Sequence, residues 1–74
     1  MMPPPHLQTS PTFDVVRSGD RWAIKGPKGR TIISAASQKV AIALAWLAAK
    51  YLRPAKVRLL TPDGQVERGW SYPA

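Results

Sequence analysis

Few side chains in this sequence could transfer a proton, attack as a nucleophile or hold a metal. The chain has no cysteine, and its one histidine, His6, lies in a proline-rich end. A Ser–His triad, a Cys–His pair and a zinc site all need such side chains within the folded part. Ser34, Ser37 and Ser71 therefore have no general base in the folded part. We expect no Ser–His triad, no Cys–His pair and no zinc site there.

The carboxylates do not suggest catalysis either. There are four, Asp14, Asp20, Asp63 and Glu67, and two of them fall in predicted turns, where Asp is common for backbone reasons. No two are placed by the sequence to form an acid–base pair or a metal site. We therefore predict a protein that is not an enzyme, with no cofactor and no bound metal.

Positive charge is the dominant chemical feature. The 74 residues include 11 Lys and Arg against 4 Asp and Glu, a formal net charge of +7. All of that charge falls on residues 12–74, because residues 1–11 contain none of these four types. A chain this short forms at most one domain with a small core, so the sequence predicts a small basic binding module.

The first candidate binding surface lies on a predicted helix. Ile42 and Trp46 are expected on the solvent side of that helix, beside three cations, so that the predicted partner-binding residues are Lys39, Ile42, Trp46, Lys50 and Arg53. Trp is a frequent interface anchor, and Lys and Arg reach carboxylates or phosphates. The alternative is that the N-terminal arm or the Trp70–Tyr72 end covers Trp46.

Two further basic surfaces are candidates for nucleic acid. The glycine loop of residues 26–30 carries Lys28 and Arg30, and its backbone N–H groups could hold a phosphate; the alternative is a plain basic turn. A predicted sheet face carries Arg21, Lys25, Arg58 and Arg68. Such a face with nearby aromatics can bind single strands; the alternative is an ordinary solvated face.

The elements that position these residues follow from residue alternation and turn signals. Alternating apolar and polar residues predict strands, and Gly- or Pro-containing turns separate them. The predicted strands are 12–17, 21–25, 30–33, 56–60 and 65–72, with Gly69 as a possible bulge. This order, with one helix between the third and fourth strands, predicts an α+β domain: a small antiparallel sheet, β-β-(β)-α-β-β, covered on one face by the helix.

The helix is predicted from about Ser37 to about Leu52. Ser34 and Ser37 are both suitable N-caps, the interior is rich in Ala, Leu and Lys, and Pro54 ends the helix. At about 100° per residue, Val40, Leu44, Leu47 and Tyr51 share one face. We expect this face to be the one that packs on the sheet.

Residues 1–11 hold four of the eight prolines and are predicted to form a disordered arm, with residues 12–74 as the single basic domain. The arm is either a passive tail or a segment that orders on binding a partner. No signal peptide is recognisable at the N-terminus. The longest apolar run, residues 40–49, is too short to span a bilayer, so we expect a cytoplasmic protein that does not bind membranes.

The chain also shares a set of short motifs with a known family. These are Trp22-Ala23-Ile24-Lys25, an Ala-rich helix that starts at Ser37-Gln38, a strand over residues 57–60, and Asp63-Gly64 before a closing strand with Tyr72. From Phe13 to Tyr72 the chain resembles a family of small uncharacterised domains of bacteria and their phages. It departs from that family in its proline-rich arm and its acid-poor helix. The shared motifs are structural, so the resemblance implies a fold and no function.

At the level of its class, a small basic chain without catalytic groups also resembles phage proteins that bind host RNA polymerase. Two functions therefore stand side by side. In the first, the protein docks on an acidic surface of a host complex such as RNA polymerase and regulates transcription; the class resemblance implies a phage-encoded protein in this role. In the second, it binds DNA or RNA directly through its sheet face and loops. A structural phage component is a third possibility.

Overall fold

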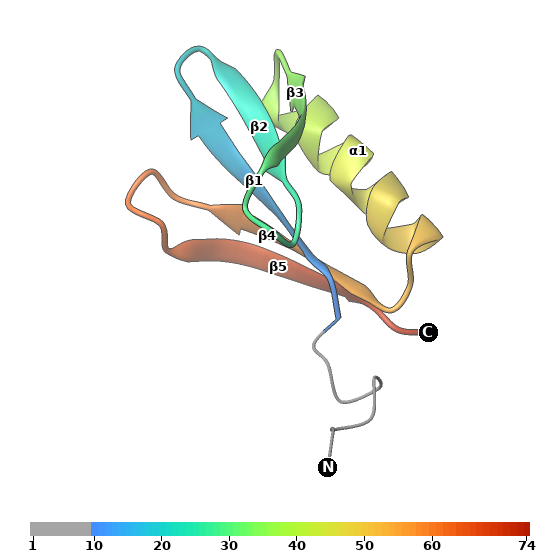
Figure 1. Ribbon diagram of the computed structural model, residues 1–74. Coiled ribbons are helices and arrows are strands. Elements are labelled where there is room, and N and C mark those ends of the chain that lie inside the picture. Colours follow the sequence, from blue (N-terminus) through green and yellow to red (C-terminus); the bar gives the residue numbers. More distant parts are fainter. Residues whose placement is uncertain (1–9) are drawn as a thin grey trace.

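The computed structural model describes residues 10–74 of the chain (Figure 1). It contains five strands and one helix in the order β-β-β-α-β-β. The bounds are β1 Thr12–Ser18, β2 Arg21–Lys25, β3 Thr31–Ala35, α1 Gln38–Tyr51, β4 Ala55–Leu60 and β5 Val66–Tyr72. The strands form one sheet in the order β3-β2-β1-β4-β5, and α1 packs on one of its faces (Figure 1). The predicted α+β class is confirmed.

One pairing in the sheet departs from expectation. β1 pairs in parallel with β4, while the other three pairings are antiparallel, so the sheet is mixed. The predicted antiparallel sheet is wrong at this point. The reason is that α1 returns the chain along the sheet, and β4 then enters beside β1 in the same direction, as a helical crossover allows.

Most of the predicted arm, residues 1–9, lies outside the described residues, and so does His6. The last two residues of the predicted arm are described, and both are partly buried. Lys56 N–H donates a hydrogen bond of 2.9 Å to the carbonyl oxygen of Pro11. The hydrogen bonding between the N-terminal segment and β4 therefore begins at Pro11, one residue before β1.

The helix ends are as predicted. Ser37 is the N-cap, and its side-chain oxygen accepts a hydrogen bond of 3.2 Å from Val40 N–H. This bond satisfies one of the backbone donors that the first turn of a helix leaves unpaired. At the other end, Leu52 is the C-cap, two residues before Pro54.

The rotation of α1 about its axis differs from the prediction. The buried helix residues are Ala41, Ile42, Ala45 and Ala49, and they pack on Phe13, Val15, Ile24, Val57 and Leu59. The face expected in the core is largely outside: Val40 is 51% exposed, Leu47 64% and Tyr51 89%, while Leu44 is half-buried. Ile42, expected in solvent, is 9% exposed and belongs to the core.

The physical reason is the match between large and small side chains. The sheet already offers Phe, Val, Ile and Leu side chains to the space under the helix, and a row of alanines lets the helix approach them closely. Because α1 is apolar nearly all round, hydrophobicity alone does not select the buried face.

A bulge in β5 decides which side chains face the helix. The register passes from Leu59–Arg68 to Leu60–Val66, which leaves Glu67 as the extra residue. The bulge is thus at Glu67 and not at the predicted Gly69. Arg68 opposite Leu59 and Trp70 opposite Val57 lie on the helix side, since both of their partners are core residues, whereas Val66 is turned to the open side.

Two substitutions on α1 test the helix rotation. Ala45→Leu should lower the free energy of unfolding by about 1–3 kcal/mol, because it overpacks the space between helix and sheet. Leu47→Ala should change it by less than about 0.5 kcal/mol, because Leu47 faces solvent. Urea denaturation of both variants measures the two effects. A loss of about 2–5 kcal/mol in Leu47→Ala would place Leu47 in the core instead.

Candidate functional site

A groove lies between α1 and β5, and we call it the tryptophan groove. It has a cavity volume of about 490 Å³. It is lined by Gln38, Lys39, Ile42, Ala43, Trp46, Arg68 and Trp70. Its walls are mostly apolar, and its polar groups are an amide and two cations. This combination suits a ligand that has an apolar body and negative charge.

Two tryptophans give the groove its shape. Trp46 and Trp70 meet edge to face, with ring centroids 5.4 Å apart and an interplanar angle of 76°. Trp46 reaches β5 because the alanine face turns it to that flank of the helix, and Trp70 faces α1 because its strand partner is the buried Val57. Edge-to-face pairs of this kind are favourable, so each ring holds the other in place.

Trp46 is neither fully open nor fully covered. It is 37% exposed, since Trp70 covers only part of its ring. Contact with the Trp70–Tyr72 end was one of the two alternatives for this residue. The structure combines them: the ring is fixed against β5 and still presents surface to solvent.

Positive charge surrounds the groove. Arg68 lies over the Trp70 ring, with its guanidinium carbon 5.4 Å from the ring centroid, in a cation–π contact. Lys39 stands in the first turn of α1, where the helix dipole is also positive and no acidic residue offsets it. None of the groove residues is acidic, so the groove favours an anionic group.

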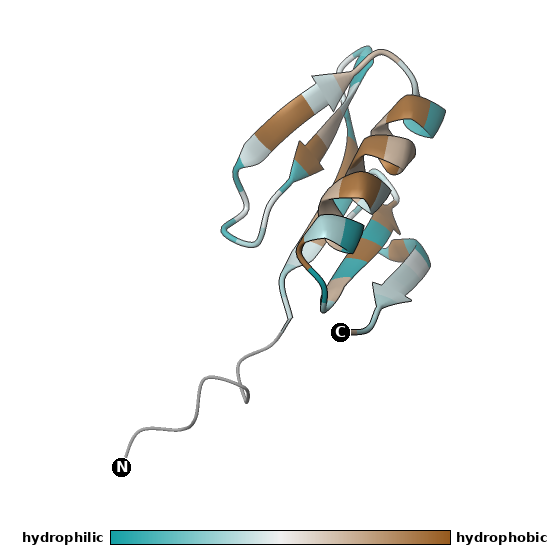
Figure 2. Cartoon of the chain, turned by 90° about the vertical axis from the view of Figure 1, so that its right-hand side faces the viewer, coloured by the Kyte–Doolittle hydropathy of each residue, from teal (hydrophilic) through white to brown (hydrophobic). Residues whose placement is uncertain are grey.

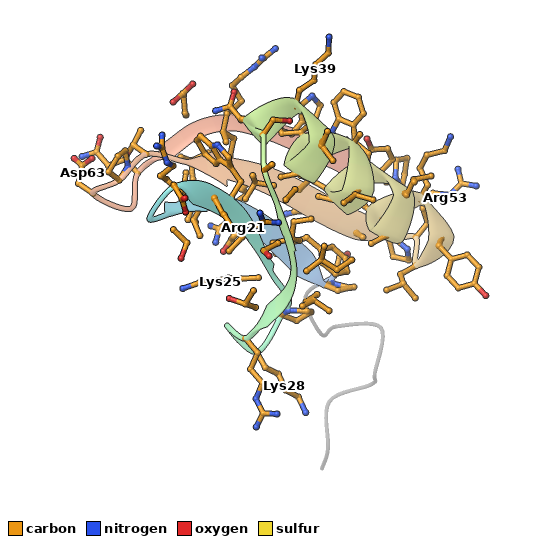
Figure 3. All side chains as sticks on the ribbon, turned by 90° about the horizontal axis from the view of Figure 1, so that it is seen from above. Arg21, Lys25, Lys28, Lys39, Arg53 and Asp63 are labelled. Carbon is orange, nitrogen blue, oxygen red and sulfur yellow. The ribbon has the colours of Figure 1, made fainter. Side chains whose placement is uncertain are left out.

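The structure divides the predicted partner-binding residues into two groups. Lys39, Ile42 and Trp46 line the groove, with Ile42 as a buried part of its floor. Lys50 and Arg53 do not line it: Lys50 lies in the last turn of α1 and Arg53 follows the helix. Figure 3 shows Lys39 and Arg53 near opposite ends of the helix.

The open face of the sheet is the second predicted surface. Lys25 and Arg58 are both register partners of Asp14, and Arg21 alternates to the same side as Lys25. Lys56 lies on this face as well, because it is two residues before Arg58 in β4. Lys56 was not among the residues predicted for this surface, although this spacing places it there. Arg68 does not belong to this face, because it pairs with the buried Leu59 and alternates to the helix side with Trp70.

One ion pair occupies the centre of the open face. Arg58 donates two hydrogen bonds to Asp14, from Nε to Oδ1 at 2.7 Å and from Nη2 to Oδ2 at 2.9 Å. Its hydrogen bonding and attraction to Asp14 raise the pKa of the Arg58 guanidinium. Asp14 therefore already occupies the guanidinium that was predicted to bind nucleic acid.

Aromatic residues are missing from the open face of the described sheet. Phe13, Trp22, Trp70 and Tyr72 all alternate to the helix side, where they are buried or pack against the core. Base stacking needs exposed aromatic rings. The open face thus offers cations for phosphates without rings for bases.

The glycine loop forms a closed hairpin turn. Gly29 N–H donates to Gly26 O at 2.9 Å, and Gly26 N–H donates to Arg30 O at 2.9 Å. Gly29 has a φ of 79°, a conformation that favours glycine. Because these two N–H groups bond within the loop, they are not available to cradle a phosphate. Lys28 and Arg30 remain as exposed cations at the turn (Figure 3).

Two residues of the tryptophan groove were not predicted to lie together: Arg68 was assigned to the open sheet face, and Trp70 was not named as a site residue. The signal for Trp70 was present as the predicted contact of the C-terminal strand with Trp46. The signal for Arg68 was also present, because Arg68 is two residues before Trp70 and alternation sets both on one side of β5.

Comparison with known proteins gives one match. A family model described as an uncharacterised protein conserved in bacteria (DUF2188) matches residues 13–72. No curated protein and no solved structure matches the chain. No helix among residues 10–74 is long and apolar enough to cross a membrane.

A double-mutant cycle on the open face tests the Asp14–Arg58 pair. Asp14→Asn, Arg58→Gln and the double variant should give a coupling free energy of about 0.2–1 kcal/mol by urea denaturation. The reason is partial exposure: the side chains of Arg58 and Asp14 are 44% and 22% exposed, so water screens their attraction. A coupling of 3 kcal/mol or more would show that the pair is shielded from water in solution.

Proposed function

The chain belongs to the DUF2188 family of uncharacterised proteins conserved in bacteria, and we propose that it is a non-catalytic basic binding protein of the cytoplasm. It docks through the tryptophan groove on an acidic segment of a larger host complex and thereby regulates that complex. The class-level resemblance to phage proteins that bind RNA polymerase makes the polymerase the candidate partner and transcription the regulated process.

The single observation that supports this proposal is the composition of the tryptophan groove. Two large aromatic rings are fixed against each other while one stays 37% exposed, and two cations flank them. Energetically dominant interface residues are enriched in Trp and Arg. An acidic loop with an apolar side chain fits such a groove, because the side chain contacts the rings while its carboxylates meet Lys39 and Arg68.

Direct binding of nucleic acid is the second candidate function, and it has a surface of its own. Arg21 and Lys25 on β2 and Lys56 on β4 share the open face, with β1 between the two strands. They could contact phosphates, while the absence of aromatic rings there gives no means of reading single-stranded bases. This candidate therefore predicts contacts to a nucleic-acid backbone without sequence preference.

A pair of arginine variants tests docking on the polymerase. Arg68→Glu in the groove should weaken binding to purified, nuclease-treated RNA polymerase by tenfold or more in biolayer interferometry, because it places a like charge against the acidic segment. Arg21→Glu on the open face makes the same change of charge and should weaken it less than threefold. Equal losses would mean that binding follows net charge alone, and no binding by the wild type would refute the polymerase as partner.

A salt series with the same variants tests the nucleic-acid candidate. Three phosphate contacts predict that log K falls with log[salt] with a slope of about −2.7 for duplex DNA. Arg21→Glu should make that slope shallower, and Arg68→Glu should leave it unchanged, which is the reverse of their expected ranking in the polymerase assay. Fluorescence anisotropy with a labelled duplex measures the slope. No detectable binding at about 50 mM salt would remove this candidate.

A further inference from the structure

A row of large apolar side chains runs along the outside of α1, and we call it the outer ridge. It consists of Val40, Leu44, Leu47 and Tyr51, which follow one another at helical spacing. Leu44 is half-buried at the base of the ridge. The side chains of Val40, Leu47 and Tyr51 are 51%, 64% and 89% exposed, respectively. At a rise of about 1.5 Å per residue, the ridge extends over roughly three turns, or about 16 Å.

The outer ridge is separate from the tryptophan groove. At about 100° per residue, its members lie on the flank of α1 that is turned away from Trp46. Trp46 leans toward β5 at one edge of the sheet, so the ridge lies toward β3 at the other edge. There Ile33, the partner of the buried Ile24, adds a side chain that is 45% exposed. Figure 2 shows the hydrophobic middle of β3 at the edge of the sheet.

Contiguous apolar surface on a small domain marks an interface, and here the charges around it define the partner. Between Asp20 and Asp63 the sequence has no Asp or Glu, so α1 and its flanking loops carry no negative charge. At about 100° per residue, Lys39 and Lys50 fall on the side of the helix between the ridge and Trp46, and Arg53 follows the helix end. A partner on the ridge must therefore bring negative charge along one side of an apolar stripe.

This charge pattern disfavours a second copy of the chain as the partner. Two ridges packed against each other would bring six cations together with no carboxylate on either helix to offset them. Like charges across an interface oppose association. An acidic partner meets the same surface with favourable electrostatics.

We propose that the outer ridge binds an amphipathic helix of a protein partner, with apolar residues on one face and Asp or Glu along one border of that face. Ridges of side chains at helical spacing fit into the grooves of a facing helix, and amphipathic helices are a common ligand of such surfaces. Leu47 lies in the centre of the contact, and the acidic border meets Lys39 and Lys50. The apolar contact lies on a different face from the groove, and Lys39, which borders both, is the one residue shared with the function proposed above.

The probe for this surface is a synthetic helical peptide of roughly 20 residues, long enough to form a helix. It carries Leu at helical spacing with Glu along one border, and its matched control has Lys in place of Glu. In an NMR titration of the full chain, the Glu peptide should shift the amide signals of Val40, Leu47 and Tyr51. The Lys peptide should bind at least tenfold more weakly.

Variants of the chain localise the contact. Leu47→Asp should weaken binding of the Glu peptide at least tenfold, because it puts a carboxylate in the centre of the interface. Val66→Asp is the matched control: Val66 is 53% exposed on β5, away from the ridge, and its variant should bind as the wild type does. Leu47→Ala, a truncation without charge, should give a smaller loss in the same direction and shows that the effect does not come from unfolding.

Three outcomes would overturn the proposal. The first is no binding of the Glu peptide at about 1 mM or equal binding of the Lys peptide. The second is a set of shifted signals confined to Trp46, Arg68 and Trp70, which would place the peptide in the groove. The third is binding only to phosphatidylcholine–phosphatidylglycerol vesicles, which would identify an anionic membrane as the partner. Because Leu47→Asp leaves the groove intact, the polymerase assay with this variant separates failure of this proposal from failure of the proposed function.

Discussion

The alanine face of α1 determines how the rest of the molecule is arranged. Ala41, Ala45 and Ala49 are fully buried, so the helix lies close to the large side chains of the sheet. Because the alanines face the sheet, the rotation of α1 about its axis leaves the bulkier apolar residues on the outside and turns Trp46 toward Trp70. The tryptophan groove and the outer ridge thus have one common origin, the small size of the side chains between helix and sheet.

The strand register distributes charge and aromatic rings in a similar way. Alternation places the strand aromatics and Arg68 on the helix side, and the bulge at Glu67 turns Val66 to the open side. The open side keeps Arg21, Lys25 and Lys56, while Arg58 is held by Asp14. A single basic chain therefore presents one surface that combines rings with cations and another that has cations alone, and these surfaces suit ligands of different chemistry.

Much of this arrangement could be predicted from the sequence, and the part that could not has a physical cause. The Ser37 cap, the stop before Pro54 and the alternation of Phe13 and Val15 are local signals, and each predicted its element correctly. The helix rotation depends on how the volumes of Ala45 and the sheet residues fit together, which periodicity does not contain. The groove was missed for the same reason: Trp46 was recognised, but its neighbours on β5 follow from the rotation of α1.

The parallel pairing of β1 with β4 has a consequence for how the chain folds. It joins residues far apart in sequence, and the Asp14–Arg58 contact across it spans 44 positions. Closing so long a loop costs chain entropy before any pairing energy is gained, and a high proportion of non-local contacts slows folding. On the ribosome, β1, β2, β3 and α1 emerge before β4, the strand that must pair with the central strand β1. The domain therefore acquires its cooperative stability only when its last third has been synthesised.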